Sequence, residues 1–276
     1  MLKTANVNGV ELHYVDQGKG APIVFVHGGL ADYREFGPIT EALPNDYRTV
    51  RYSRRFSFPN TNPPPGPSHN LLLDVDDLAG LIEKLDLGPV HVVGASYGAF
   101  TALMLALRRP DLVRSVVAAE PPLLHWLPDI DGGREAHEHF DKVVLRPSAA
   151  AFAAGDPHGA LRVAVEYFAG PDGMEQIPAE FRNMLIANLE DWRAITTANQ
   201  IFPAVSRAEM GAMSRPVLMI SGGNTAAVHR LVDPELERVL GNAERIVVED
   251  GSHDMCSEQP AVCAKAIHDF IVRNAR

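Results

Sequence analysis

The chain has 276 residues, of which 46% are hydrophobic, and its 25 basic and 35 acidic residues give a net charge of −10. This composition supplies a large core, and a single α/β domain can reach this length. An acidic balance without a basic run argues against nucleic acid and anionic membranes as partners. We therefore expect a globular protein that acts on a small molecule. The oligomeric state stays open, and a homodimer is among the states allowed.

The first six residues lack the apolar run of a signal peptide, and no stretch is long and apolar enough to span a bilayer. Cys256 and Cys263 lie in a segment predicted to be helical. There they would be separated by about 10 Å along the axis, too far for a disulfide. These features favour a reducing, cytoplasmic location.

The N-terminal part of the chain predicts a hairpin followed by alternating strands and helices. Residues 5–16 contain Asn8-Gly9 between two short alternating runs, which is a strong hairpin signal. The elements expected next are a strand at 21–26, a helix at 34–43, a strand at 47–52, a Pro- and Asn-rich loop at 53–69 and a helix at 71–87. Long loops in compact domains tend to be functional.

The most informative stretch is residues 90–109. Four apolar residues at 90–93 predict a buried strand, and an Ala- and Leu-rich helix follows Gly94-Ala95-Ser96-Tyr97-Gly98. A G-x-S-x-G sequence between a strand and a helix is typical of a nucleophile elbow, in which the small glycines let strand and helix pack closely. Ser96 is therefore the candidate nucleophile. The alternative is a glycine-rich turn that happens to contain a serine.

Beyond the elbow, a strand at 112–119 ends at Glu120, and the α/β alternation then stops until a strand at 216–220. The segment between them offers only helical pieces, expected at 134–145, 148–154, 158–169, 178–197 and 203–213. After 216–220 we expect a helix at 233–240, a strand at 244–248 and a helix at 260–273. The alternation predicts an α/β fold with a mainly parallel sheet and helices on both faces. Residues 1–120 and 215–276 would form the core, and residues 121–214 a helical cap.

A serine needs a base before it becomes a good nucleophile. His253 lies in a turn after the last predicted strand, at the sheet edge where ligands of such folds bind, and is the candidate base. A lone histidine in a loop is usually only solvated, but the elbow upstream favours the catalytic reading. His137 and His139 are too closely spaced to share a helix face, and no Cys/His cluster has zinc spacing, so we expect no metal and no cofactor.

The chain resembles the α/β-hydrolase superfamily along nearly its whole length. The resemblance rests on His27-Gly28-Gly29, the Ser96 elbow and Gly251-Ser252-His253, which occur in the family's order. It implies a core sheet with a helical cap inserted after the strand that follows the elbow. It also implies an oxyanion hole made by the Gly29 and Tyr97 N–H groups. The alternative is that the His27 motif merely ends a strand.

The acid of the triad is where the chain departs from the common family pattern. In most relatives it follows the strand matching residues 216–220, but here residues 221–226 contain no carboxylate, and Thr225 occupies the acid's usual place. Glu120 ends the strand after the elbow helix and resembles the acid of a branch that includes some haloalkane dehalogenases. We take Glu120 as the third member of the triad. The alternatives are that Glu120 is a solvated charge, that Asp233 serves instead or that the acid is missing.

The remaining candidates for contact with substrate are His27, Arg54, Arg55, His125, Trp126 and Trp192. Each arginine could hold a carboxylate, although pairing with Asp or Glu is the commoner role for arginine. The aromatic residues could line an apolar pocket, although aromatics at helical spacing more often belong to the core.

These observations predict a serine hydrolase that cleaves a small carboxylic ester or lactone through an acyl-enzyme. The serine at the elbow argues against ester-forming dehalogenases and epoxide hydrolases of this fold, which resemble Asp enzymes. The alternatives are hydrolysis of a C–C bond in a ketonic acid, a lyase or cyclase of secondary metabolism, and a hydrolase-like ligand receptor without turnover.

Overall fold

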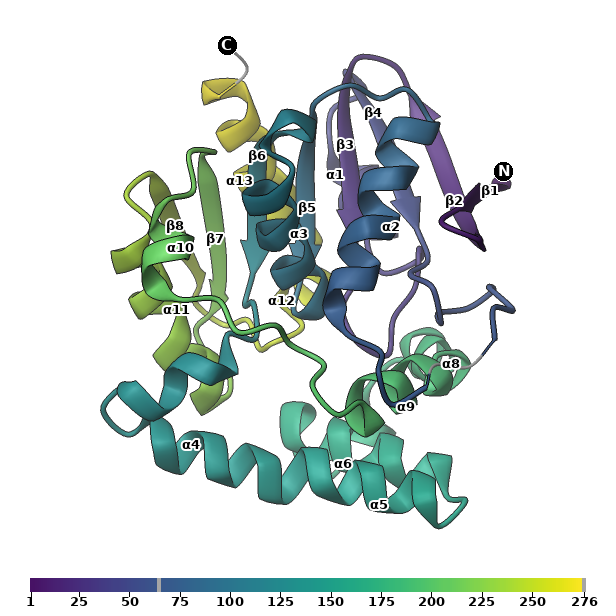
Figure 1. Cartoon of the computed structure of the whole chain (residues 1–276), viewed down its shortest axis with the longest axis vertical. Helices are drawn as coiled ribbons and strands as arrows, with labels where there is room; N and C mark the ends of the chain where they lie inside the picture. Colours follow the sequence, from purple (N-terminus) through teal and green to yellow (C-terminus); the bar gives the residue numbers. More distant parts are fainter. Residues whose placement is uncertain (64–65, 275–276) are drawn as a thin grey trace.

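The computed structural model describes residues 1–63 and 66–274, so residues 64 and 65 of the predicted loop at 53–69 lie outside the described residues. One sheet has the strand order β1-β2-β4-β3-β5-β6-β7-β8 (Figure 1). The strands are β1 (Leu2–Val7), β2 (Val10–Gly18), β3 (Ala21–Val26), β4 (Tyr47–Tyr52), β5 (Val90–Ala95), β6 (Val113–Ala119), β7 (Val217–Gly222) and β8 (Ala243–Val248). The pairs β1–β2 and β2–β4 are antiparallel, and the other neighbours are parallel. The predicted α/β fold with a mainly parallel sheet is confirmed.

The first two strands form the predicted hairpin. Asn8 and Gly9 have φ angles of 48° and 79°. This pair of positive values is what a two-residue type I′ turn requires, and its twist matches that of the flanking strands.

Helices cover both faces of the sheet, and alternate residues of β3 explain why. The helices of the core are α1 (Gly37–Ala42), α2 (Leu71–Lys84), α3 (Tyr97–Arg108), α11 (Ala227–Val239), α12 (Met255–Glu258) and α13 (Pro260–Arg273), with a short 3₁₀ turn η1 (Pro110–Leu112). Val24 and Val26 belong to one hydrophobic cluster with α2 and α3, whereas Ile23 and Phe25 belong to another with α1 and α13. Because successive side chains of a strand point to opposite faces, both faces of β3 are buried.

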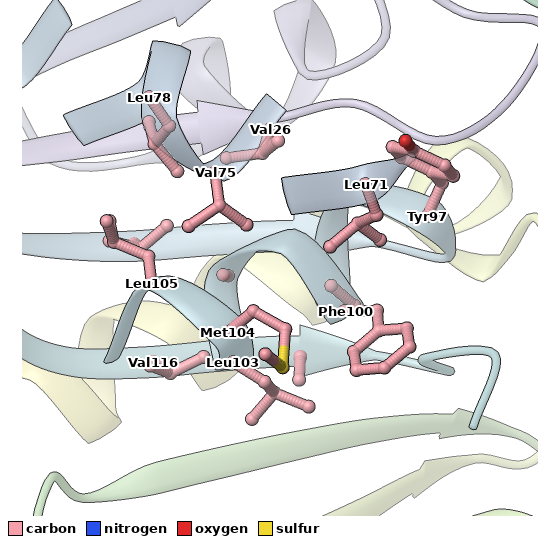
Figure 2. Close-up of a cluster of buried hydrophobic side chains, with 14 of the residues drawn as sticks. Val26, Leu71, Val75, Leu78, Tyr97, Phe100, Leu103, Met104, Leu105 and Val116 are labelled. Carbon is pink, nitrogen blue, oxygen red and sulfur yellow. The ribbon is translucent and has the colours of Figure 1, made fainter. Parts of the chain in front are cut away.

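The elbow helix α3 is anchored by its apolar side chains. Figure 2 shows residues of α2 and α3 meeting residues of β3 and β6 in a single cluster; the labelled members are Val26, Leu71, Val75, Leu78, Tyr97, Phe100, Leu103, Met104, Leu105 and Val116. Burial of one such large side chain contributes about 1.5–3 kcal/mol. The N-terminus of α3, where Ser96 lies, is therefore held firmly against the sheet.

Residues 121–214 between β6 and β7 form a helical insertion, in which the described residues contain no strand. Its elements are η2 (Leu124–Asp129), α4 (Gly133–Phe140), η3 (Asp141–Leu145), α5 (Arg146–Ala153), α6 (Pro157–Ala169), α7 (Gly173–Gln176), α8 (Ala179–Ala187), α9 (Leu189–Thr197) and α10 (Arg207–Gly211). Helices α4, α5, α6, α8 and α9 gather at one end of the sheet, at the bottom of Figure 1. That end carries the carboxyl termini of the parallel strands.

Several predicted helix boundaries were wrong, for tertiary reasons. The helix expected at 178–197 is divided at Asn188, whose buried side chain donates to Asp32 Oδ2 (2.7 Å) and accepts from Phe58 N (2.8 Å). The helix expected at 134–145 continues through η3, a π turn, into α5. A π turn leaves backbone groups without their usual partners, so the chain tolerates Pro147, which has no N–H, as the second residue of α5.

Three further differences are smaller. The helices expected at 34–43 and 203–213 shorten to α1 and α10. Cys256 and Cys263 lie on two separate helices, α12 and α13, rather than on one, and both thiols are free and buried.

Within the described ranges, no helix has the combination of length and hydropathy that crossing a membrane requires.

Candidate active site

Ser96 stands at a sharp turn between β5 and α3, with φ 49° and ψ −117°. This conformation is rare for a residue other than glycine and marks local strain. A Cβ on Gly94 would lie 2.3 Å from Gly98 O, and a Cβ on Gly98 would lie 2.0 Å from Val26 O. Both glycines of the motif are therefore required by close backbone packing, as the sequence pattern predicts.

The loop after β3 lies beside this turn. A Cβ on Gly28 would lie 3.5 Å from Ser96 Cβ, and Gly29 and Tyr97 line the same cavity as Ser96. Within residues 1–63 and 66–274, neither the Gly29 N–H nor the Tyr97 N–H donates to another protein group. Two backbone donors without a protein acceptor in the described residues thus belong to residues that line the cavity together with Ser96.

Glu120 directly follows β6, has φ 48° and is fully buried. Its Oε2 accepts from His253 Nδ1 (2.6 Å) and from Thr225 Oγ1 (2.7 Å), and its Oε1 accepts from Gly222 N (2.7 Å). Thr225, which stands where the resemblance puts the usual acid, therefore donates a hydrogen bond to the carboxylate that comes from β6. The arrangement fixes Glu120 against the Nδ1 side of the imidazole.

Asp233, the alternative acid, lies in α11 and has a different partner. Its Oδ2 accepts from Ser221 Oγ (2.6 Å), and the described residues include no hydrogen bond between Asp233 and His253. Burial, reinforced by the nearby Glu120 charge, raises the pKa of Asp233 to about 8. The Asp233 carboxyl is therefore mostly protonated at neutral pH and cannot supply the charge that orients an imidazolium.

The contact between Glu120 and His253 shifts the pKa of both groups. Burial alone would lower the pKa of His253, but the hydrogen bond and charge of Glu120, helped by Asp254, raise it above its ordinary value. Burial alone would raise the pKa of Glu120, but the hydrogen bond and charge of His253 outweigh it and lower this pKa. The pair therefore favours an ionised carboxylate and a histidine that readily accepts a proton.

His229 of α11 is an unpredicted member of the site. Its ring stacks on that of His253, with centroids 4.3 Å apart and planes at 12°, and the Phe168 ring also stacks on His253 at 4.7 Å. Burial, together with the His253 charge, lowers the pKa of His229 to about 3, so it is neutral under ordinary conditions. Nothing in the local sequence distinguishes this residue, because only the packing of α11 on the site brings it next to His253.

Glu120, His229 and His253 offer ligand atoms within 4.8 Å of one another, which raises the question of a metal. The lone pairs of an imidazole lie in the plane of its ring, and the two rings are stacked almost parallel. They cannot both point at one ion without turning, and Glu120 already accepts three hydrogen bonds. The geometry is that of an oriented histidine pair rather than of a metal centre.

Ser96, His229 and His253 open into one cavity between the sheet edge and the helical insertion. Its other walls are mainly apolar and include Leu124, Phe140, Leu145, Val165, Phe168, Ile177, Phe181, Leu185, Trp192, Ile195 and Phe202. Among the described residues that line it there is no lysine or arginine, whereas two acids, Glu35 and Asp254, do line it. Among the lining residues that the structure describes, a ligand carboxylate therefore meets no cationic side chain.

Glu35 lies close to the loop after β3. Its Oε2 accepts from Gly28 N (2.9 Å). Burial, with a contribution from Asp254, raises the pKa of Glu35 to about 8. At neutral pH the group is mostly a neutral acid, and it becomes an anion only in alkaline solution.

The two candidate arginines are in ion pairs. Arg54 pairs with Asp191 (2.9 Å), and Arg55 pairs with Asp77 (2.8 Å). Neither arginine lines the cavity among the described residues. Both arginines therefore have the commoner of the two expected roles, which is an ion pair with an acid. Each lies next to a buried carboxylate of another element.

The other four candidates for contact with substrate differ in whether they line the cavity. Trp192 lines the cavity, whereas His27, His125 and Trp126 are not among its described lining residues. His125 Nε2 and Trp126 Nε1 both lie within hydrogen-bond distance of Val205 O, at 2.7 and 2.8 Å. These two rings therefore tie η2 to the chain that leads back to the core.

Comparison with known proteins agrees with this architecture. The uncharacterized hydrolase YraK of Bacillus subtilis is 33% identical, over 45% of this chain and 46% of that protein. The 2-(acetamidomethylene)succinate hydrolase of Mesorhizobium japonicum is 25% identical over 98% of this chain and 94% of that protein. The chain thus spans about half the length of the first relative and nearly all of the second.

Solved structures show the same fold at lower identity. The enol-lactonase from Burkholderia xenovorans has a TM-score of 0.81 at 24% identity, covering 98% of this chain and all of that one. A thermophilic esterase from Thermogutta terrifontis has a TM-score of 0.79 at 20% identity, covering 99% of each chain. An epoxide hydrolase from Vigna radiata has a TM-score of 0.77 at 20% identity, covering 99% of this chain and 98% of that one.

The family model described as the alpha/beta hydrolase family matches residues 23–266, which contain the elbow, the helical insertion and His253. The protein is therefore a hydrolase-fold enzyme, and the chain belongs to the alpha/beta hydrolase family.

Proposed function

We propose that this hydrolase cleaves neutral carboxylic esters or lactones through an acyl-enzyme on Ser96. The observation that carries the proposal is the 2.6 Å contact between Glu120 Oε2 and His253 Nδ1, at a cavity that both Ser96 and His253 line. A carboxylate at Nδ1 holds the proton there and leaves Nε2 free to act as a base. The other required parts, the strained elbow and two free backbone donors, lie at the same end of the sheet.

In the first half of the reaction, His253 Nε2 takes the Ser96 proton as Oγ attacks the carbonyl carbon of the ester. The oxyanion of the tetrahedral intermediate accepts hydrogen bonds from Gly29 N and Tyr97 N. When the intermediate collapses, the C–O bond to the alcohol breaks and His253 returns its proton to the departing oxygen. In the described residues Ser96 Oγ donates no hydrogen bond to His253, and such contacts often tighten only when substrate is bound.

In the second half, water attacks the acyl-enzyme with His253 again as base, and the products are a carboxylic acid and free Ser96. A lactone follows the same steps, except that the alcohol stays attached to the acyl group and the product is a hydroxy acid. Glu120 stabilises the imidazolium each time it forms, while its own proton count does not change.

The cavity supports the ester or lactone assignment over C–C cleavage of a ketonic acid. A cationic side chain favours binding of a carboxylate-bearing substrate, and the described lining residues include no lysine or arginine. The apolar lining contributed by Phe181, Leu185 and Trp192 suits a hydrocarbon acyl chain. Ser96 at the apex, in place of an aspartate, likewise disfavours epoxide opening.

The test combines an active-site probe with a substrate panel. A fluorophosphonate should label the wild-type protein once and should not label Ser96→Ala. The panel compares p-nitrophenyl butyrate and δ-valerolactone with a succinate monoester that carries a free carboxylate. We expect turnover of the neutral compounds and at least about tenfold lower kcat/KM for the charged one. Preference for the carboxylate-bearing ester, or labelling that persists in Ser96→Ala, would contradict the proposal.

A further inference from the structure

The peptide that joins Gly28 to Gly29 is held from the side facing away from the cavity. Gly28 O accepts from Arg54 Nη2 (2.9 Å) and lies 2.8 Å from His27 Nδ1. Because Arg54 N donates to His27 Nε2 (2.9 Å), the His27 proton is on Nδ1, and that atom donates to Gly28 O. The Gly29 N–H belongs to the same planar trans peptide as the Gly28 carbonyl. Two donors on the carbonyl therefore fix the direction of the N–H.

Arg54 also contacts the residue that carries the second oxyanion donor. Its guanidinium lies over the Tyr97 ring, 4.1 Å from the centroid, and the Tyr97 hydroxyl donates to Asp74 Oδ2 (2.7 Å). Such stacking of a guanidinium on an aromatic ring is attractive, and more so away from water. A single buried side chain thus braces both sides of the oxyanion hole.

The counterion of Arg54 comes from the helical insertion. Asp191 of α9 accepts through one oxygen, Oδ2, from Arg54 Nη2 (2.9 Å) and from Leu30 N (3.0 Å). The loop is therefore held immediately before and immediately after Gly29. Leu30 has φ 59°, a conformation that needs support from its surroundings. Arg54 and Asp191 are each 1% exposed.

A fully buried ion pair is weak evidence for stability, because apolar residues of similar volume often stabilise a fold as well or better. We infer that the Arg54–Asp191 pair is a positioning device: Asp191 on the helical insertion holds Arg54, and Arg54 holds the Gly28–Gly29 peptide and the Tyr97 ring in the geometry that an oxyanion requires. The stabilisation of the oxyanion then depends on α9 being seated on the core. This inference rests on the proposed serine hydrolase function.

The experiment must separate positioning of the oxyanion hole from support of the fold. The double variant Arg54→Met/Asp191→Leu removes both partners of the pair together, so that neither is left buried without the other. The matched control is Arg55→Met/Asp77→Leu. It removes the neighbouring ion pair, in which Asp77 is buried and Arg55 is half-buried. This pair shares the same loop but has no described hydrogen bond to residues 28–30. Thermal unfolding of all proteins shows whether each variant keeps its fold.

The decisive readout is the ratio of kcat/KM for an ester to that for its thiono analogue, in which the carbonyl oxygen is replaced by sulfur. Backbone N–H groups stabilise a developing oxyanion far better than a developing thiolate, so an intact oxyanion hole gives a large ratio. Loss of one oxyanion donor costs about 10²–10³-fold in kcat. In Arg54→Met/Asp191→Leu we expect the oxo ester to lose about 10²-fold, the thiono ester to lose much less and the ratio to contract at least about tenfold. Asp191→Asn, which keeps an acceptor for Leu30 N, should contract it less.

In the control variant the ratio should stay at the wild-type value. A folded Arg54→Met/Asp191→Leu protein with an unchanged ratio would overturn the inference while leaving the serine hydrolase proposal intact, and so would an equal contraction in the control. If the wild-type protein neither hydrolyses esters nor reacts with a fluorophosphonate, the proposed function fails, and the inference fails with it.

Discussion

Glu120→Gln is the substitution for which the structure predicts the most specific outcome. In the native site, Oε1 accepts from Gly222 N and Oε2 accepts from His253 Nδ1. A glutamine has one acceptor and one donor in place of two acceptors. If its oxygen keeps the Gly222 bond, its NH₂ group faces His253 and forces the imidazole into the tautomer that is protonated on Nε2. That tautomer cannot accept the Ser96 proton.

The opposite orientation of the amide has a cost that the contacts allow us to work out. It would restore the Nδ1–H tautomer of His253, but the NH₂ group would then face the Gly222 N–H and leave a buried donor unsatisfied, which costs about 1–3 kcal/mol. This penalty alone corresponds to about a 5- to 150-fold loss of rate. Loss of the carboxylate charge beside the imidazolium adds to it. We therefore expect kcat to fall by about 10²–10⁴-fold, in the range of other losses of a triad acid.

The assay is steady-state hydrolysis of p-nitrophenyl butyrate at saturating substrate, with circular dichroism to verify the fold. Asp233→Asn is the matched control, because the Asp233 carboxyl is already mostly neutral at pH 7 and bonds to Ser221 rather than to His253. It should change kcat by less than about threefold. If Asp233→Asn costs more than Glu120→Gln, or if Glu120→Gln keeps most of its activity, the assignment of the acid is wrong.

Three further outcomes follow from the site. The kcat/KM of the wild-type enzyme should fall as the pH drops through a His253 pKa above the ordinary 6.5, because only neutral imidazole accepts the Ser96 proton; a midpoint below 6.5 in a pH–rate profile would refute this. The profile should also fall above about pH 8, because ionised Glu35 would place a negative charge beside the oxyanion, and Glu35→Gln should remove this alkaline fall; its persistence in the variant would point to another group. Gly98→Ala should lower the Tm by about 6 °C or more in calorimetry, because its Cβ would lie 2.0 Å from Val26 O and the overpacking costs about 3 kcal/mol; an unchanged Tm would show that the elbow can relax.

Much of the fold could be predicted because it depends on local patterns. The apolar runs of the strands, the Asn8-Gly9 turn and the glycines around Ser96 each have a physical requirement that is visible in a few neighbouring residues. The helical insertion was also predictable, from the interruption of the α/β alternation. Helix ends within it were not, since a feature such as the break at Asn188 depends on contacts with Asp32 and Phe58, which are distant in the sequence.

In the candidate site, too, the residues marked by a local sequence pattern could be predicted, and those brought together by tertiary packing could not. Glu120 could be singled out because the usual position of the acid is empty of carboxylates and because Glu120 ends a neighbouring strand. The roles of Arg54, Glu35 and His229 could not be anticipated. Arg54 meets Asp191, 137 positions further along the chain, and His229 reaches His253 only because α11 packs against the site. Such contacts are set by tertiary packing and leave no local pattern.

In the proposed mechanism, hydrolysis passes through an acyl group covalently bound to Ser96. Its most direct test is rapid quenching of the enzyme during turnover of a slowly deacylated ester, followed by intact-mass measurement and peptide mapping. We expect a transient gain of one acyl mass, located on the peptide that contains Ser96 and absent from Ser96→Ala. Turnover with no covalent adduct at any time, or an adduct on another residue that survives in Ser96→Ala, would contradict it.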